Sequence, residues 1–222
     1  MPIEPAGAGD PSSESDEGVR AMSQTSTDAI AAMYFESLGK LLDVIDLDAV
    51  DRVVRAIRRA RDREGLVYVA GNGGSAATAT HWVNDLCKAT RADGRLPIKA
   101  MSLTDNTSFL TALANDEGYD RVFAGQLESF AKPGDVLIVI SASGNSPNLV
   151  RAVETARERG VATIALLGFD GGILKEKADD FVWLPTEVGA YGLAETGHSV
   201  VTDVITTCLI REIASEGSKE LA

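Results

Sequence analysis

Apolar positions follow a helical period in the first part of the chain. Between residues 27 and 65 they recur every three or four residues, which predicts two amphipathic helices with a break near Asp46. Such stripes indicate packing in a core or against another subunit. They consist of Ile30, Met33, Tyr34, Leu38, Leu41 and Leu42 in the first helix and of Val50, Val53, Val54 and Ile57 in the second.

After Gly65 the pattern changes to short apolar runs that alternate with helix-like segments. The runs predict strands at residues 66–70, 98–102, 136–141, 162–167 and 181–184. Helices are expected at residues 75–90, 108–115, 120–130, 147–159, 172–178 and 193–215. Strands that alternate with helices predict an α/β fold, in which a parallel sheet carries helices on both faces.

Composition places the chain among ordinary globular proteins. It has 222 residues, 45% of them hydrophobic and 24% charged, which is enough for one large α/β domain or two small ones. The net charge of -12 argues against a surface that binds nucleic acid. Residues 52–63 form a basic run, which we interpret as the solvated face of an amphipathic helix, with nucleic-acid contact as the alternative.

The ends of the chain and its cysteines bear on location. Residues 1–25 are rich in proline, glycine, serine and acids, which predicts a disordered acidic tail without the features of a secretory signal. A single domain is expected over residues 26–217. No stretch approaches 18 continuous apolar residues, so no membrane span is expected. Cys87 and Cys208 lie far apart in no metal-like spacing, which favours reduced thiols and a cytoplasmic protein.

A glycine-rich turn follows the first predicted strand. Residues 71–75 read Gly-Asn-Gly-Gly-Ser and precede a predicted helix, so bare N–H groups and a helix N-terminus would face an anion. A dinucleotide-binding turn needs a third glycine where Ala76 stands, and a P-loop needs a Lys-Ser/Thr ending that is missing here. The turn therefore predicts an anion site of another kind, to which Asn72 and Ser75 would contribute.

A second turn of similar design follows the third predicted strand. It reads Ser-Ala-Ser-Gly-Asn-Ser over residues 141–146, and Pro147 suits the first position of a helix capped by Ser146. Ser141, Ser143 and Ser146 bring three hydroxyls to a place where a phosphate could bind. The alternative is a capped turn that binds nothing. In a parallel sheet both turns would lie at the carboxyl edge, where ligands bind.

At these turns the chain resembles the sugar isomerase (SIS) domain family and, within it, the phosphoheptose isomerases. The similarity extends from about residue 28 to residue 215. It is carried by GNGGSAATATHW, LTALANDEGYDRVFAGQL, GDVLIVISASGNSPNLVRAVETARERG, LLGFDGG and AETGHSVVTDV. The resemblance implies a flavodoxin-like sheet and a homotetramer whose core includes the N-terminal helices, with sites at subunit interfaces. It also implies that Ser141, Ser143 and Ser146 hold a sugar phosphate, with help from Asn72 and Ser75.

The chemistry implied is aldose–ketose isomerisation through a cis-enediol, here of sedoheptulose 7-phosphate to D-glycero-D-manno-heptose 7-phosphate. Phosphoheptose isomerases use a glutamate and a histidine, and some hold zinc with these two residues, a second histidine and a glutamine. Here the second histidine is His81, whereas Asp85 stands for the glutamate, Glu195 for the glutamine and Asp203 for the catalytic histidine. Ala142 replaces a usual threonine between the first two serines.

The spacing of these four residues gives an independent indication. His81 and Asp85 are neighbours on one helix face, and Glu195 and Asp203 lie two turns apart on the last helix. Three carboxylates on a buried face would repel one another unless they bound a cation or shared protons. We therefore predict a divalent metal among the four, zinc by first choice with manganese and magnesium open, and catalytic roles for Asp85, Glu195 and Asp203. The alternative is that some are ordinary surface acids.

Two further points stay open in the sequence. His198 lies on the same predicted helix but faces away from Asp203, which indicates a structural role or a contact with a neighbouring subunit. A non-catalytic SIS protein that binds sugar phosphates or acts as an adaptor is the alternative function. Loss of the histidine at position 203 favours it, whereas retention of His81, Asp85 and Glu195 favours the enzyme.

Overall fold

The computed structural model describes residues 26–219, so the tail predicted over residues 1–25 lies outside the described residues. The chain divides into two compact units, residues 1–37 and residues 38–222, with the division inside helix α2 (Thr27–Asp43). The single domain expected over residues 26–217 stays a prediction. Everything that follows on the sheet and the candidate site concerns the second unit.

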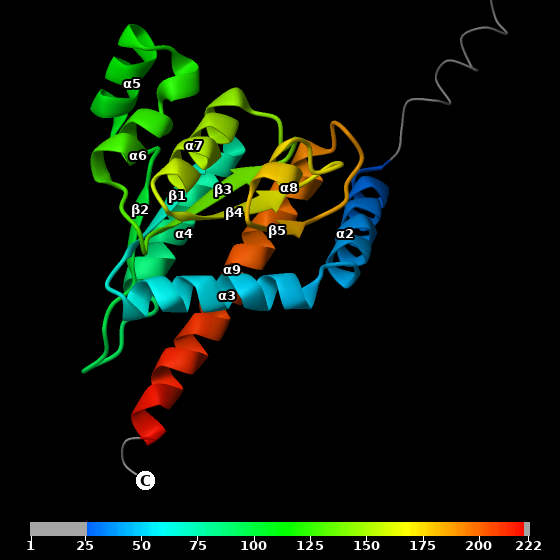
Figure 1. Cartoon of the computed structure of the whole chain (residues 1–222). Coiled ribbons are helices and arrows are strands. Elements are labelled where there is room, and N and C mark those ends of the chain that lie inside the picture. Colours follow the sequence, from blue (N-terminus) through cyan, green and yellow to red (C-terminus); the bar gives the residue numbers. More distant parts are fainter. Residues whose placement is uncertain (1–25, 220–222) are drawn as a thin grey trace, which may run out of the picture. The chain divides into compact units, whose positions relative to one another are not determined.

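Five parallel strands form the sheet, in the order β2-β1-β3-β4-β5 (Figure 1). Their bounds are β1 Leu66–Gly71, β2 Lys99–Ser102, β3 Val136–Ser141, β4 Ala162–Leu167 and β5 Asp180–Trp183. This is the flavodoxin-like strand order, in which the direction of sheet building reverses next to β1. The predicted α/β fold is confirmed, and each predicted strand lies within two residues of an observed one.

Helices cover both faces of the sheet. Their bounds are α3 Leu47–Asp62, α4 Gly74–Lys88, α5 Thr107–Asp116, α6 Ala124–Phe130, α7 Pro147–Glu158, α8 Leu174–Lys177 and α9 Tyr191–Lys219, and a 3-10 helix η1 spans Tyr119–Arg121. The helix predicted over residues 120–130 is wrong in one respect, because it is divided between η1 and α6. Val122 and Phe123 lie at the division and are both fully buried, so the break allows two adjacent side chains to enter the core.

The break between the first two helices lies where the sequence predicts it. The Asp46 carboxylate accepts hydrogen bonds from the backbone N–H groups of Asp48 and Ala49, at 2.9 and 3.2 Å. An aspartate in this position satisfies N–H groups that have no partner inside the helix and suits the positive end of the helix dipole. The Asp-Leu-Asp sequence therefore starts α3 rather than continuing α2.

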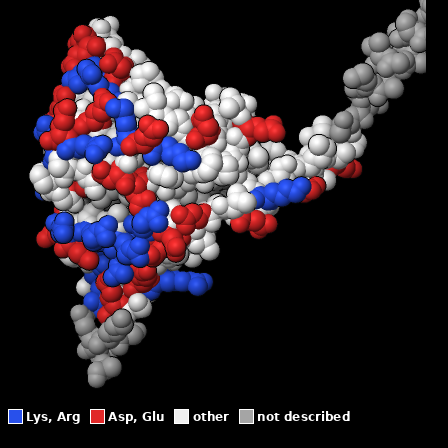
Figure 2. Space-filling view, turned by 45° about the vertical axis from the view of Figure 1, so that its right-hand side comes forward, with Lys and Arg blue, Asp and Glu red and all other residues white. Residues whose placement is uncertain are grey.

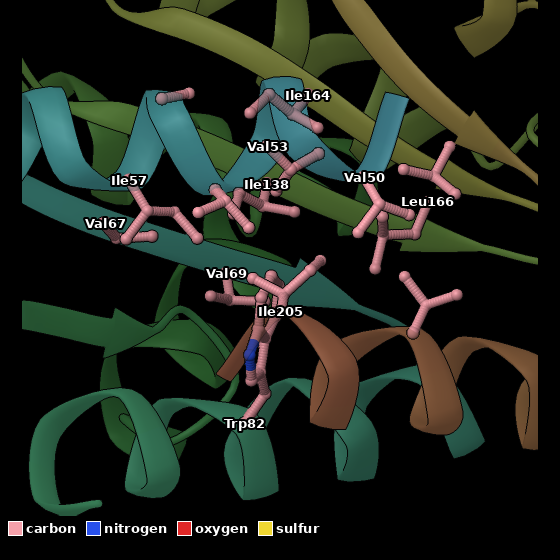
Figure 3. Packing of buried hydrophobic residues seen from close by; sticks show 14 of the residues in the cluster. Val50, Val53, Ile57, Val67, Val69, Trp82, Ile138, Ile164, Leu166 and Ile205 are labelled. Carbon is pink, nitrogen blue, oxygen red and sulfur yellow. The ribbon is translucent and has the colours of Figure 1, made fainter. Parts of the chain in front are cut away.

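One core packs α3, α4 and α9 against the same face of the sheet (Figure 3). Ile57 of α3 lies beside Val67 and Val53 lies beside Ile138 (Figure 3), because every second side chain of a strand points to one face. Trp82 of α4 and Ile205 of α9, in the lower part of the view, pack on the same face beside Val69 (Figure 3). Full burial of a large apolar side chain contributes about 1.5–3 kcal/mol, so this layer fixes α4 against α9.

The second core lies on the other face of the sheet. Tyr68, Leu137 and Val139, which alternate with the residues of the first core, pack there against buried side chains of α6 and α7. Central strands β1 and β3 are thus buried on both faces, which explains why they appear in the sequence as continuous apolar runs. The two turns of interest follow these two strands.

The basic run of α3 makes ion pairs within the chain. Arg52 meets Asp180 at 2.7 Å, Arg58 meets Glu212 at 3.0 Å, and both terminal nitrogens of Arg61 meet Glu216 at 2.9 Å. Figure 2 shows basic and acidic side chains intermixed over the face turned to the viewer. These pairs favour the interpretation of the run as a helix face. In the described part of the chain, no helix is both long and apolar enough to cross a membrane.

Candidate active site

The two small-residue turns lie side by side at the carboxyl edge of the sheet. Asn72 and Gly73 connect β1 to α4, and residues 142–146 connect β3 to α7. Because β1 and β3 are neighbouring parallel strands, their turns are neighbours too. The N-termini of α4 and α7 follow directly, so two helix dipoles present their positive ends near this edge.

Two of the three serine hydroxyls of the second turn accept hydrogen bonds within the turn. The Ser141 Oγ accepts from the Gly144 N–H at 3.0 Å, and the Ser143 Oγ accepts from the Asn145 N–H at 3.3 Å. Ser146 occupies the cap position of α7, but its side chain makes no capping hydrogen bond. The sequence therefore predicts the cap position of Ser146 correctly. Its hydroxyl remains available for a ligand.

A cavity of about 150 Å3 opens between the two turns and the start of α9. It is lined by Asn72, Ser75, Ile140, Ser141, Ala142, Ser143, Ser146, Leu149, Tyr191 and Glu195. The lining includes all five residues predicted to bind phosphate. It also includes one of the three carboxylates predicted to be catalytic, Glu195.

Glu195 reaches the cavity across the first turn of α4. A Cβ atom at position 74 would fall 2.5 Å from the carboxylate oxygens of Glu195, so with any larger residue there this carboxylate would have to move. One turn before Glu195, the ring of Tyr191 packs edge to face on Phe169, with centroids 5.0 Å apart. The start of α9 is thus held against the loop that follows β4.

The other ionisable residues lie farther along the seam between α4 and α9. The helices meet where Thr78 and Ser199 place their hydroxyls 3.5 Å apart, and again where Trp82 donates to Thr206 at 3.1 Å. His81 on α4 and Asp203 on α9 both come between these two contacts in the sequence. Both residues therefore lie on the helical turns between these contacts, beyond the part of α4 and α9 that borders the cavity.

Within this seam only two of the four predicted metal ligands meet. The Nε2 of His81 lies 3.4 Å from an oxygen of Asp85, and Asp85 also accepts a hydrogen bond from Asn84 at 3.0 Å. The His81 side chain is 71% exposed, and Asp203 is exposed as well. No three histidine, cysteine or acidic residues of the described chain gather closely enough to hold an ion. One chain alone therefore does not form the predicted centre.

Comparisons with known proteins show the family of this chain. A family model for the SIS domain matches residues 33–168. A phosphoheptose isomerase of Geobacter sp. (strain M21) is 40% identical over 182 residues, which cover 81% of this chain and 90% of that protein. A probable phosphoheptose isomerase of Thermoplasma volcanium is 43% identical over 155 residues, or 70% of this chain and 79% of the relative. The chain belongs to the phosphoheptose isomerase family of SIS-domain proteins.

Solved structures of phosphoheptose isomerases share the fold of this family member. The enzyme from Neisseria gonorrhoeae has a TM-score of 0.72 at 29% identity and covers 87% of this chain and 97% of its own. The one from Francisella tularensis has a TM-score of 0.77 at 26% identity, covering 85% and 100%. The chain is thus an isomerase of this family by both sequence and fold.

His198 on α9 lies inside the protein. Its side chain is fully buried, and neither ring nitrogen has a hydrogen bond of normal geometry to the described chain. Burial lowers the pKa of His198 to about 4, and the nearby backbone of Leu167 opposes this only in part. The histidine is therefore neutral inside the protein at pH 7. Its burial within one chain supports the structural role predicted for it.

Three residues of the site are missing from the sequence-based prediction. Tyr191 lines the cavity because α9 begins two residues earlier than predicted. Asn148 is buried in the first turn of α7 and exchanges hydrogen bonds with Asn72, and Tyr119 adds a third bond to the same amide. The position of Asn148 directly after Ser146 and Pro147 could have indicated a role at the cavity, whereas no sequence feature near Tyr119 indicates one.

Proposed function

We propose that this phosphoheptose isomerase relative interconverts sedoheptulose 7-phosphate and D-glycero-D-manno-heptose 7-phosphate. One observation carries the proposal: the carboxylate of Glu195 and the hydroxyls of the second turn belong to one cavity. An aldose–ketose isomerase of a sugar phosphate needs both features, a group that holds the phosphate and a base near the reacting carbons.

The phosphate would bind at the second turn. Ser143 and Ser146 offer hydroxyls there, and the N-terminus of α7 adds the positive end of a helix dipole. Hydrogen bonds to a phosphate are charge-assisted and thus stronger than those between neutral groups. Bound in this way, the phosphate would position the sugar without taking part in the reaction.

Glu195 is the acid–base group best placed for the reaction. Its carboxylate would take the proton from C1 of the ketose while the C2 oxygen gains a proton, which gives the cis-enediol. Return of a proton to C2 and loss of the proton from the C1 hydroxyl would then yield the aldehyde. Asp85 and Asp203 remain proposed partners in proton transfer, and each lies farther along the seam than Glu195.

The size of the cavity supports a site shared between subunits. Its volume of about 150 Å3 is well below the roughly 300–1,000 Å3 usual for ligand pockets, so part of a heptose would extend beyond it. We propose a homotetramer in which a second copy completes the site. Within the first unit, Ile30, Met33 and Phe35 each expose more than half of their surface, as an assembly helix would. Light scattering should give about four times the 23.4 kDa chain mass, and a monomer would contradict this proposal.

A divalent metal, with zinc as first choice, stays part of the proposal. Its support is the donor chemistry of His81, Asp85, Glu195 and Asp203, of which only the first two meet within one chain. A bound cation would hold the carboxylates ionised and polarise sugar oxygens. We also propose a cytoplasmic location, since Cys87 and Cys208 are free thiols.

A non-catalytic sugar-phosphate binder or adaptor is the competing proposal. Its support is Asp203, which is exposed and stands where phosphoheptose isomerases have a histidine. Such a protein would use the serine turn in the same way. It would have no use for Glu195 in the cavity, which is why we favour the enzyme.

Exchange of protons with solvent separates the two proposals. Sedoheptulose 7-phosphate is incubated with the protein in deuterium oxide, with and without divalent metals, and deuterium in the sugar is followed by NMR. We expect incorporation at C1 and C2, loss of it in Glu195→Gln, and no change in the exposed control Glu158→Gln. Phosphate binding without any exchange would favour the adaptor.

A further inference from the structure

Two asparagines connect the two turns of the cavity. The Nδ2 of Asn72 donates to the Oδ1 of Asn148 at 3.0 Å, and the Nδ2 of Asn148 donates to the Oδ1 of Asn72 at 2.8 Å. The Oδ1 of Asn72 also accepts from the Tyr119 hydroxyl at 3.1 Å. Asn148 is only 2% exposed, whereas Asn72 lines the cavity.

These bonds occupy three of the four hydrogen-bonding positions of the Asn72 side-chain amide. A side-chain amide has two acceptor lone pairs on oxygen and two N–H donors on nitrogen. Asn148 and Tyr119 occupy both lone pairs of Asn72, and Asn148 takes one of its N–H groups. A single N–H donor is left. Any ligand in the cavity therefore meets Asn72 as a donor and never as an acceptor.

The orientation depends on the buried partner. If the Asn72 amide turned over alone, its nitrogen would face the nitrogen of Asn148 and its oxygen would face the oxygen. Both contacts would be repulsive, and the buried Asn148 amide would lose its hydrogen bonds without gaining water. Asn148 is fixed in the first turn of α7, so it also ties the turn after β1 to the turn after β3.

We propose that Asn148 is a positioning residue for phosphate binding. Together with Tyr119 it holds Asn72 so that the cavity offers a donor to phosphate oxygens and hides the carbonyl oxygen that would repel them. The inference rests on the proposed function in one respect, that the ligand carries a phosphate. It assigns roles to two residues that line no part of the cavity themselves.

Tyr119 is held in place from outside the cavity. It opens η1, and in the same short helix Arg121 binds Glu128 with two hydrogen bonds of 3.0 and 2.8 Å and Glu117 with one of 3.1 Å. The Tyr119 side chain is largely exposed, at 58% for the residue. Tyr119→Phe therefore removes one hydrogen bond to Asn72 without creating a cavity in the core.

Kinetics on the full-length protein test the proposal. We expect Asn148→Ala to raise both KM for sedoheptulose 7-phosphate and the inhibition constant of inorganic phosphate about ten-fold, the effect of one lost hydrogen bond. The kcat should change by less than about two-fold, because the phosphate is bound equally in ground and transition states. Tyr119→Phe should raise both constants about three-fold. Thr155→Ala, a buried polar change on the same helix, controls for loss of stability and should leave both constants unchanged.

A double-mutant cycle separates positioning from general damage. If Asn148 acts through Asn72, then Asn148→Ala should have no further effect on phosphate affinity in an Asn72→Ala background. Full additivity, or unchanged phosphate affinity in both Asn148→Ala and Tyr119→Phe, would overturn the proposal. Should Asn148→Ala fail to fold, Tyr119→Phe gives the same test when it is measured in the wild type and in the Asn72→Ala variant. Because phosphate affinity is measured directly by calorimetry, the proposal can hold even if no isomerase activity is found.

Discussion

The carboxylate of Glu195 lies over Gly74, in the space that any larger residue at position 74 would fill. A Cβ atom there would come within 2.5 Å of both carboxylate oxygens. The first residue of α4 thus determines where the proposed acid–base group of α9 can stand. The glycine at the end of this turn thus leaves the Glu195 carboxylate room to reach the cavity.

Gly74→Ala should impair catalysis while leaving the fold intact. Alanine in a helix is favoured over glycine by about 0.5–1 kcal/mol, so no loss of stability is expected. The new methyl group would displace the Glu195 carboxylate, and a misplaced base should lower kcat about ten- to hundred-fold. Steady-state kinetics and thermal melting measure the two effects. Gly39→Ala, where a Cβ would meet nothing within 4 Å, is the matched control, and an unchanged kcat in Gly74→Ala would remove Glu195 from the reaction.

Two serines of the second turn should contribute to ligand binding and little to stability. Replacing Ser143 and Ser146 by alanine should weaken sugar-phosphate binding by about 2–4 kcal/mol in total, because charge-assisted hydrogen bonds are lost. The melting temperature should change little, since Ser146 makes no capping bond and Ser143 makes only a long one. Calorimetry with the sugar phosphate measures the affinity, with Ser215→Ala on the exposed end of α9 as control. Unchanged affinity would place the phosphate elsewhere.

The strands and the sheet are predictable from the sequence because burial on both faces leaves a local mark. Strand β3 is six buried residues long and appears as an apolar run between turn residues. Helix α9 begins two residues before its prediction because Tyr191 and Gly192 follow Gly189 and Ala190, which look like the end of a loop. The division between η1 and α6 leaves no local mark, since Val122 and Phe123 suit a continuous helix equally well.

The site is predictable in parts. The two turns proposed to bind phosphate are local in sequence, so their five residues can be identified, and all five line one cavity. The ionisable residues lie on two helices, and spacing along a helix does not fix the distance between helices. Glu195 therefore joins the serines, whereas His81, Asp85 and Asp203 lie farther along the seam. The Asn72–Asn148 pair depends on contact between two turns that are 76 residues apart in sequence.

Burial of His198 predicts a loss of stability in acid. Its pKa is lowered to about 4 in the folded protein, against about 6.5 in the unfolded chain, so the unfolded state binds more protons between these values. Stability should therefore fall as the pH falls through this window. Relative to His198→Leu, the wild type should lose about 2–3 kcal/mol between pH 7 and pH 4.5.

Urea unfolding at several pH values and one protein concentration measures this loss. Comparison with the variant cancels carboxylates that titrate in acid, such as Glu128 and Glu216, whose pKa values are lowered by Arg121 and Arg61. A difference between wild type and His198→Leu that stays constant with pH would show that His198 is not buried as described.

The proposed metal site is best tested at Asp203. Within one chain only His81 and Asp85 lie in contact. An ion bound by all four residues therefore requires either a rearrangement of the side chains along α4 and α9 or a contribution from a second subunit. Asp203→Asn keeps the size and polarity of the side chain but removes the charge that a divalent cation needs. We expect it to lower both the metal content of the purified protein and its turnover at least ten-fold. Elemental analysis and the deuterium-exchange assay measure the two quantities.

Glu158→Gln, a change of an exposed acid on α7, is the control for loss of one negative charge. Full activity after exhaustive chelation, with no metal detected, would disprove the metal proposal and leave proton transfer to the carboxylates of Glu195, Asp85 and Asp203 alone.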